Sequence, residues 1–319
     1  FESSFKFNTK IANLENADVC LLIGVDPRKE AAILNLQLRK HYVNRNFKVA
    51  NIGSVLDLTF PCINVGCSVE DVIKFSQGQH FFCETLRKAK NPVVIFGSSF
   101  LNVLTESVAR SVLSFISKNA RLVSDGWNGL NFLSFQASQV GASEVGITLN
   151  DSGYKSKVVY AVGDASIEDI YQDAFVVYQG HQGNINALRA DLILPGSAYT
   201  EKESTFINTE GRVQKTQKVL LAPGKAKVDS LILSTLINVL SQESGILDSR
   251  FIEVENYNFV KSNFFIKNHF NSFCYSKLVN KFIFSSHVNN FYLSDPISKA
   301  SPTMSKCSKQ LLLKNPFAI

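Results

Sequence analysis

The sequence predicts an α/β fold of the Rossmann type, with a mainly parallel sheet and flanking helices. Short apolar runs of buried-strand type recur along the first two thirds of the chain, and segments with apolar residues at helical spacing separate them. This alternation is typical of parallel sheets that helices cover on both faces. A glycine stands directly at the end of five of the six runs, where such sheets form their ligand crevices.

The first strand, turn and helix are the clearest elements. "DVCLLIG" (18–24) is a continuous apolar run, "VDP" is a turn, and "RKEAAILNLQLRKH" (28–41) repeats apolar residues at helical spacing. A second helix is expected within "LTESVARSVLSFIS" (104–117) and a third over 226–242. The same reasoning predicts further strands, at 47–53, 92–98, 157–164, 174–180 and 191–195.

The pattern changes near Pro223-Gly224, which predicts an α/β domain over 1–224 and a second part over 225–319. This second part is expected to be one helix and an irregular, extended basic tail that packs on the domain and on partner subunits. From Asn256 to Ile319 the chain has eight lysines and one acidic residue, whereas the rest is almost neutral. Since these lysines lie among Phe, Asn and Ser with no Arg, RNA-binding signature or Cys/His finger, no nucleic-acid partner is predicted.

Composition narrows the class of protein further. Hydrophobic residues form 45% and charged residues 19% of 319 residues, which is typical of a globular chain. The most apolar stretch, "LILSTLINVL" (231–240), is too short to cross a membrane as a helix, so no direct span is expected. Because the chain opens on Phe1 without an initiator Met or a signal segment, we expect a processed product or a piece of a longer protein.

The cysteines predict no metal site. None forms a C-x-x-C pair, and only two stand close together, whereas zinc and iron–sulfur sites need several thiolates at short spacings. Unpaired thiols without a secretory signal fit a reducing compartment. The six are Cys20, Cys62, Cys67, Cys83, Cys274 and Cys307.

The stretch "DLILPGSAYTEKESTFINTEGRVQ" (191–214) is the strongest candidate for a ligand site. Its first piece is a strand that ends at Pro195-Gly196, after which Ser197 or Thr200 can cap a short helical turn whose free N–H groups favour an anion. Its second piece is a predicted hairpin with Gly211 at the position that needs a positive φ.

Four polar residues of this hairpin are expected to lie close together around its bend. Such a cluster of amide, carboxylate and guanidinium groups can bind a polar heterocycle. It can equally hold a turn to its neighbours, with Glu210 and Arg212 as a structural ion pair. The four are Asn208, Glu210, Arg212 and Gln214.

Catalytic signals are weak. His181 lies between glycines in "YQGHQGN", but the sequence fixes no nucleophile or acid beside it, so a hydrogen-bonded loop residue is the favoured interpretation. The chain contains no G-x-G-x-x-G after a strand and no Walker A sequence. No catalytic, cofactor-binding or metal residue is therefore assigned.

Four segments together carry a resemblance to a known family: "ADVCLLIGVDPRKEA", "VVYQGHQGN", "RADLILPGSAYTEKESTFINTEGRVQKT" and "FYLSDPISKASPTMSKC". In this order, from about Ala17 to about Ser308, they resemble the C-terminal half of the large iron–sulfur subunits of mitochondrial respiratory complex I, NADH:ubiquinone oxidoreductase. The third segment is shared with the molybdopterin oxidoreductase superfamily, whereas the last resembles the complex I subunits alone. Gln182 and Asn184 stand where the family often has His and Asp.

The resemblance implies a molybdopterin oxidoreductase-like domain that has lost its cofactor and carries no redox centre. The iron–sulfur clusters are then expected on an N-terminal half that this chain lacks, and the partners are that half and other subunits of the matrix arm, on the matrix side of the mitochondrial inner membrane. The chain would be the C-terminal polypeptide of a split subunit or a fragment of a longer one. The alternative is a molybdopterin- or nucleotide-binding oxidoreductase subunit that uses the crevice.

Overall fold

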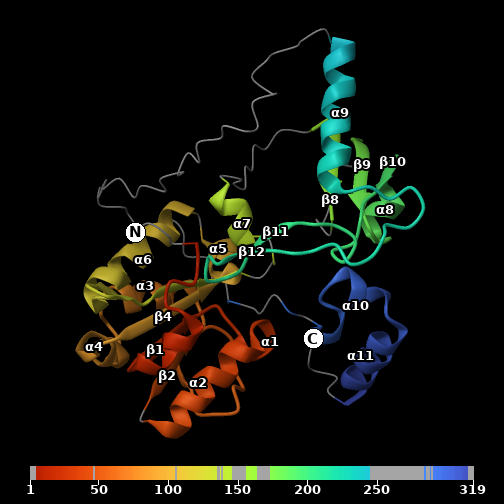
Figure 1. Ribbon diagram of the computed structural model, residues 1–319. Coiled ribbons are helices and arrows are strands. Elements are labelled where there is room, and N and C mark those ends of the chain that lie inside the picture. Colours follow the sequence, from red (N-terminus) through yellow and green to blue (C-terminus); the bar gives the residue numbers. More distant parts are fainter. Residues whose placement is uncertain are drawn as a thin grey trace. The chain divides into compact units, whose positions relative to one another are not determined.

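A five-stranded parallel sheet forms the centre of the first of two units in the computed structural model (Figure 1). The structure describes residues 5–45, 47–104, 106–134, 137, 139–145, 156–163, 173–244, 284, 288 and 290–314. The first unit comprises Phe1–Ile147, Ile207–Val213 and Lys261–Asn289, and the second comprises Thr148–Phe206, Gln214–Val260 and Asn290–Ile319. The division at residue 224 stays a prediction, since these units follow different boundaries.

The sheet of the first unit has the strand order β3-β2-β1-β4-β7, and each neighbouring pair is parallel. The strands β1, β4 and β7 are buried along their whole length, as expected where both faces of a sheet are covered. The strands are β1 (Val19–Ile23), β2 (Lys48–Ile52), β3 (Ile63–Gly66), β4 (Pro92–Gly97) and β7 (Leu130–Leu133).

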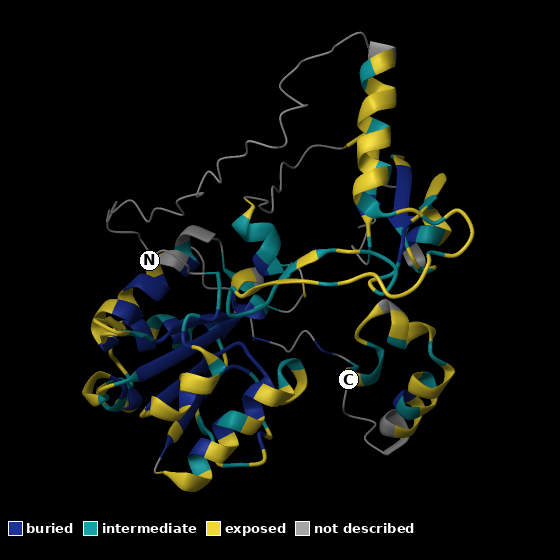
Figure 2. Cartoon of the chain, in the orientation of Figure 1, coloured by how far each residue is buried: buried dark blue, intermediate teal, exposed yellow. Residues whose placement is uncertain are grey.

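Helices cover both faces of this sheet, and Figure 2 shows the strands buried between them. Because side chains alternate along a strand, Leu21 packs into one hydrophobic cluster and Leu22 into the other. The Leu21 cluster includes α3 (Val69–Ser76), α4 (Phe81–Lys88) and α6 (Glu106–Ala120), and the Leu22 cluster includes η1 (Ile11–Asn16) and α2 (Ala32–Asn44). Shorter elements are α1 (Pro27–Glu30), α5 (Ser98–Val103), β5 (Val123–Ser124), β6 (Trp127–Asn128) and α7 (Gln139–Glu144).

The second unit contains a smaller parallel sheet with the order β10-β9-β8. Its strands are β8 (Val158–Val162), β9 (Phe175–Gly180) and β10 (Leu192–Pro195), with α8 (Ile185–Arg189) between the last two. The two-stranded hairpin of β11 (Thr205–Ile207) and β12 (Val213–Lys215) comes next along the chain, and its bend, Ile207–Val213, belongs to the first unit. The helix α9 (Asp229–Ser244) of the second unit follows. The described part of the C-terminal region adds η6 (Phe291–Leu293), α10 (Pro296–Ala300) and α11 (Pro302–Lys314).

The predicted α/β class with a mainly parallel sheet is confirmed, and all six predicted strands are present. They divide between two sheets, however, and the sequence pattern did not predict β3 and β7. The predicted helix over 226–242 corresponds to α9. The tail was expected to be extended, but its described residues 290–314 are mostly helical; residues 245–283 lie outside the described part of the chain.

Candidate functional site

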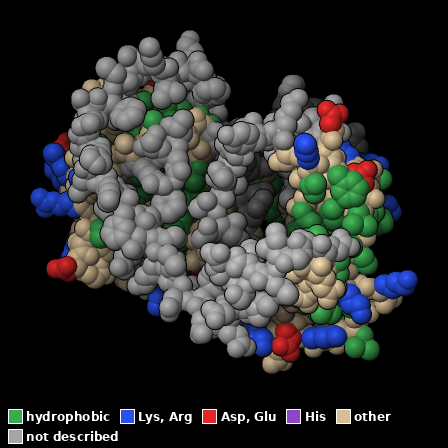
Figure 3. All heavy atoms as spheres, turned by 90° about the horizontal axis from the view of Figure 1, so that it is seen from above, with side chains coloured by type: hydrophobic (Ala, Val, Ile, Leu, Met, Phe, Trp, Pro, Cys, Tyr) green, Lys and Arg blue, Asp and Glu red, His purple; other side chains and the backbone are tan. Residues whose placement is uncertain are grey.

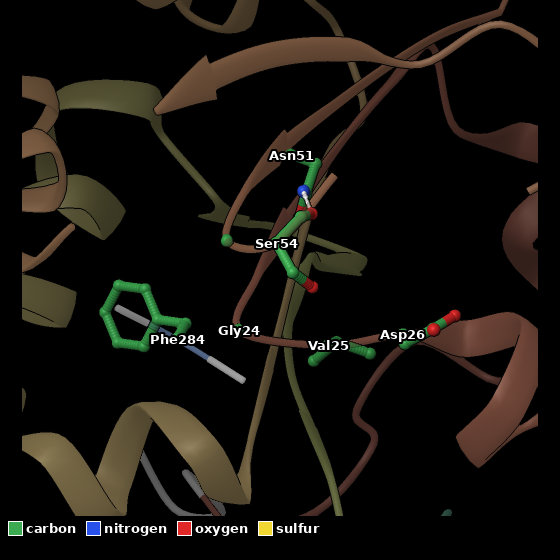
Figure 4. Close-up of a pocket in the computed structure, with 7 residues that line it drawn as sticks. Gly24, Val25, Asp26, Asn51, Ser54 and Phe284 are labelled. Carbon is green, nitrogen blue, oxygen red and sulfur yellow. Dashed lines mark hydrogen bonds between the residues drawn. The ribbon is translucent and has the colours of Figure 1, made fainter. Parts of the chain in front are cut away.

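The carboxyl ends of β1 and β2 form the crevice where parallel sheets of this kind hold their ligands. The cavity that remains there has a volume of about 10 Å³, which is room for about one water molecule. Figure 4 shows the residues around it. They are Gly24, Val25, Asp26, Asn51, Gly53, Ser54 and Phe284.

Backbone geometry at the end of β1 brings the strands and the following loops close together. Gly24 has a φ of +58°, a conformation that favours glycine, and its N–H donates to the carbonyl of Ile52 over 2.9 Å. Its own carbonyl accepts a hydrogen bond from the hydroxyl of Ser99. A Cβ at Gly24 would lie 2.6 Å from that hydroxyl, so the close approach requires glycine.

The Asn51 and Asp26 side chains of the crevice bind neighbouring parts of the same chain. The Asn51 amide donates to the carbonyl of Ser54 over 2.8 Å, the bond drawn in Figure 4. Asp26 caps α1 by accepting from the backbone N–H of Arg28 over 3.2 Å, and the Lys29 ammonium lies 3.8 Å from the other carboxylate oxygen. These groups are therefore already engaged in holding the loops.

Phe284 fills the apolar side of the crevice. Its side chain is 1% exposed, and its ring centroid lies 6.1 Å from that of Phe100. Its backbone N–H donates to the carbonyl of Cys67 over 3.3 Å, which fixes the chain at the end of β3. Figure 4 shows the ring beside Gly24. The sequence pattern did not predict a role for this residue.

The predicted hairpin is present. Gly211 has a φ of +82°, and the Asn208 side chain accepts from the backbone N–H groups of Glu210 and Arg212 over 3.1 and 2.7 Å. The ion pair suggested between Glu210 and Arg212 does not form in the described part of the chain. Glu210 instead accepts from the backbone N–H of Ile11 over 2.6 Å, because that donor needs a partner at the start of η1. Gln214 is exposed on β12.

An N-terminal segment joins the bend of this hairpin to the large sheet. The N–H of Phe7 donates to the carbonyl of Thr209 over 2.8 Å, and Phe7 forms an antiparallel bridge with Asn131 of β7. The fully buried amide of Asn131 accepts from the N–H of Thr9 over 2.7 Å and donates to its hydroxyl over 3.0 Å. The Asn208 side chain, the Thr209 carbonyl and the Glu210 carboxylate are thus bonded within the first unit, whereas Arg212 is exposed.

A second polar cluster lies at the carboxyl ends of β9 and β10. Gln179 is 0% exposed, accepts from the Tyr160 hydroxyl and donates to Asp229 over 2.8 Å. The other oxygen of Asp229 forms an ion pair with Lys202. Burial and the Asp229 charge raise the pKa of Tyr160, which keeps its hydroxyl a donor.

The predicted anion-binding turn after β10 is not helical. Ser197 is buried, its N–H donates to the carbonyl of Lys227 over 2.9 Å, and its hydroxyl has no hydrogen-bond partner in the described part of the chain. The Thr200 carbonyl accepts from the N–H groups of Val219 and Leu220. Because this turn is not helical, it does not present the free N–H groups of a helix start that were expected to bind an anion.

His181 is exposed and lies in the loop after β9, which also contains Gln182 and Asn184. Asn184 caps α8 through its side chain, which accepts from the N–H groups of Asn186 and Ala187 over 3.0 and 3.1 Å. The Tyr178 hydroxyl donates to the carbonyl of Gln182 over 2.6 Å. These contacts are those of a structured loop.

The cysteines that the structure describes are not gathered into a site. Burial, with the nearby Cys62 thiol, raises the pKa of the fully buried Cys20, and burial raises the pKa of Cys62 to about 11. Cys67 is exposed. In the ranges given above, no group of three His, Cys, Asp or Glu side chains could hold a metal ion. Cys274 lies outside those ranges.

The doubly wound sheet and the crevice at its strand ends define an α/β domain of the class that holds dinucleotide-type cofactors. The profile described as molybdopterin oxidoreductase matches residues 1–239, so the chain belongs to this family. A second profile, which describes the C-terminal region of G-type subunits of NADH-ubiquinone oxidoreductase, matches residues 262–307.

The curated relatives carry the names of complex I subunits. The NADH-ubiquinone oxidoreductase 75 kDa subunit of Reclinomonas americana is 35% identical over 325 residues, which cover 97% of this chain and 47% of the relative. The NADH-ubiquinone oxidoreductase 78 kDa subunit, mitochondrial, of Candida albicans is 37% identical over 96% of this chain and 45% of the relative. The subunit of the same name from Neurospora crassa is 35% identical over 96% of this chain and 43% of the relative. The chain therefore spans about half the length of these relatives.

Proposed function

We propose that the chain is a structural, non-redox portion of the large iron–sulfur subunit of respiratory complex I. The complex would transfer electrons from NADH to ubiquinone and couple this transfer to proton translocation, with iron–sulfur clusters on the N-terminal half of the subunit. The names of the relatives and the match of residues 262–307 support this assignment.

The observation that carries the structural role is Phe284 in the crevice. A pterin dinucleotide needs a cleft far larger than the 10 Å³ that remain beside this ring. The second strand-end cluster supports the same interpretation, because Gln179, Asp229 and Lys202 satisfy one another there. The chain's own side chains thus occupy positions where a cofactor would compete with them.

The remaining parts of the proposal concern assembly. The chain would be the C-terminal polypeptide of a split subunit, and it would bind the cluster-bearing N-terminal half and other subunits of the peripheral arm on the matrix side of the mitochondrial inner membrane. No helix in the described part of the chain has the length and apolarity that a membrane span requires. Contacts to partner polypeptides would then hold it at the membrane complex.

A cofactor-binding oxidoreductase subunit is the second candidate. The match of residues 1–239 to the molybdopterin oxidoreductase family favours it, as do Asp26, Asn51 and Ser54 in the crevice. Displacement of Phe284 would enlarge that crevice. Cofactor content separates the two candidates.

The test begins with the native complex, purified through an affinity tag on this chain. We expect NADH:ubiquinone oxidoreductase activity and the other subunits to copurify, with no stoichiometric molybdenum or tungsten by elemental analysis and no released pterin or nucleotide by mass spectrometry. The same purification from untagged cells is the control. A stoichiometric pterin would support the second candidate. Recovery of the tagged chain without any other subunit of the complex would refute the proposal that the chain is a structural part of complex I.

A denaturing gel of the same preparation tests the split subunit. We expect a band near 35.4 kDa that peptide mapping assigns to this chain, and a separate cysteine-rich band. Since the chain spans 47% of the relative from Reclinomonas americana, one band of about twice that mass, containing both sets of peptides, would contradict the split.

A further inference from the structure

The segment between β12 and α9, in the second unit, carries positive charges and no negative one. We define the basic loop as residues 215–228. It contains four lysines, and no acidic residue occurs between Gly211 and Val228. Lys215 pairs with Glu203 over 3.0 Å, whereas the described part of the chain contains no ion pair of the other three lysines. These three are Lys218, Lys225 and Lys227.

Three consecutive aliphatic residues at the middle of the basic loop are exposed to solvent. The exposed fractions are 78% for Val219, 55% for Leu220 and 84% for Leu221. Figure 2 shows the stretch from β12 to α9 as exposed for most of its length. Figure 3, a view of one face of the molecule, shows that other hydrophobic side chains are also exposed, with charged side chains of both signs around them. A run of exposed apolar residues costs solubility and is expected only where it has a function.

The backbone of the basic loop is held at its middle and at its C-terminal end. At the middle, the N–H groups of Val219 and Leu220 both donate to the carbonyl of Thr200, over 2.9 and 3.1 Å. At the C-terminal end, the Lys227 N–H donates to the carbonyl of Pro195 over 3.1 Å, and the Lys227 carbonyl accepts from the N–H of Ser197 over 2.9 Å. A loop fixed in this way loses less conformational entropy on binding than a free segment does.

An apolar centre with a charged border is the usual anatomy of a protein interface. From this arrangement we infer that the basic loop docks on another polypeptide of the same complex, one that presents an apolar pocket bordered by Asp and Glu. Val219, Leu220 and Leu221 enter the pocket, and Lys218 and Lys225 face the acidic border. This inference rests on the proposed function, since it takes its partner from the assembly.

Two other classes of partner fit the loop less well. A membrane-surface segment uses Trp, Tyr or Phe at the interface, and the basic loop has none. Single-stranded nucleic acid is bound by aromatic stacking and Arg, and residues 215–228 also lack Arg. A protein pocket requires only aliphatic side chains and opposite charge, which the loop provides.

Site-directed photo-crosslinking in the native complex tests the inference. A photoreactive residue replaces Leu220 in the tagged chain, and mass spectrometry maps the crosslinked peptide after irradiation. We expect crosslinks to one segment of another polypeptide, with acidic residues next to it in sequence or structure. Crosslinks confined to this chain, to lipid or to nothing would overturn the inference.

Paired variants measure the contribution of the loop to retention in the complex. We expect Leu220→Asp with Leu221→Asp to reduce the amount of the other complex subunits that copurify with the tagged chain by about tenfold or more, as loss of a buried anchor does. Lys218→Glu with Lys225→Glu should reduce it at low salt, and this difference should shrink as salt screens the charges. The matched control is Ile33→Asp with Leu36→Asp, two exposed apolar residues of α2.

The outcomes separate this inference from the proposed function. If the wild-type chain copurifies with complex I and both loop variants are retained like the control, the inference alone fails. If the wild-type chain does not copurify, the proposed function fails and the inference with it. Flotation with phosphatidylglycerol vesicles completes the test: binding that the Leu220→Asp, Leu221→Asp variant loses would assign the loop to a membrane and overturn the protein partner.

Discussion

Phe284 packs against Gly24, with its Cδ1 atom 3.4 Å from the position of a Cβ on that glycine. The two residues are far apart in sequence, and their contact closes the crevice at the end of β1. The ring has taken the place where a parallel sheet of this class presents its backbone to a ligand. The contact therefore links the stability of the first unit to the proposed loss of the cofactor.

Phe284→Ala should destabilise the first unit by about 3 kcal/mol, because it leaves a cavity among buried residues. Trp127 is the single tryptophan and lies in this unit, so its fluorescence during urea unfolding measures the change. The control is Phe291→Ala, at an exposed residue, which should stay within about 0.5 kcal/mol of the wild type. Equal midpoints for the two variants would refute the packing role of Phe284.

Asp229→Ala should destabilise the second unit by about 1–3 kcal/mol, because the Gln179 amide and the partly buried Lys202 lose their shared acceptor. Hydrogen exchange of the β9 and β10 amides should accelerate by about tenfold or more. The control is Lys88→Ala, which removes the solvent-exposed ion pair between Lys88 and Glu84 and should change the free energy of unfolding by less than about 0.5 kcal/mol. Unchanged exchange in β9 would contradict the role assigned to Asp229.

The Asp71 carboxylate should make the stability of the first unit depend on pH in the acid range. Burial of the carboxyl raises its pKa, but hydrogen bonds from Ser68 and Cys67 outweigh this effect and lower the pKa below the ordinary value of 3.8. The folded state therefore binds the proton less readily than the unfolded state. The contribution is complete above pH 3.8 and is lost as the pH falls through the lower, folded value.

Asp71→Asn should accordingly lower stability by about 1 kcal/mol at neutral pH, where it weakens the capping box of α3. The difference from the wild type should shrink as the pH falls below 3.8 and through the lower pKa of the folded state, where Asp71 becomes protonated. Urea unfolding followed by Trp127 fluorescence at several pH values checks both expectations. Glu70→Gln removes a charge from the same helix turn without these bonds, so it should cost only a few tenths of a kcal/mol. A gap that widens in acid would contradict the assignment.

The parts of the fold that the sequence predicts well are those that local pattern determines. The strands β1 and β4 are continuous apolar runs because both of their faces are buried. The strand β3 is short and contains Asn64 and Gly66, and β7 has only four residues, so neither stands out from a loop. The division of the strands between two sheets depends on long-range pairing, which no local pattern reports.

The candidate site was harder to predict for the same reason. An ion pair with Arg212 was one of two interpretations of the Glu210 carboxylate, but a backbone donor distant in sequence, Ile11, binds it instead. Phe284 occurs in a stretch rich in Asn, Ser, Phe and Lys without periodicity, and nothing local marks it as buried. A usable signal did exist for α10: Asp295 before Pro296 is a typical helix start, and the Asp295 side chain caps that helix.

The cysteines allow a prediction about thiol reactivity in the native chain. Thiolates are the reactive form and also the ligands of iron–sulfur clusters. With a pKa of about 11, about one Cys62 thiol in a thousand is ionised at pH 8, and burial keeps Cys20 protonated as well. Burial also raises the pKa of Cys83, whose thiol donates to the carbonyl of Phe75 over 3.4 Å.

We therefore expect iodoacetamide at pH 8 to label the exposed Cys67 first, Cys62 and Cys83 more slowly, and Cys20 only after unfolding. Peptide mapping by mass spectrometry resolves each site, and Cys67→Ser identifies the fast phase. The labelling rate of Cys62 should rise about tenfold for each unit of pH up to its pKa, because the thiolate fraction does. Native labelling of Cys20 or Cys62 as fast as that of Cys67 would show ionised thiols in the first unit, and it would weaken the proposal that this chain carries no redox centre.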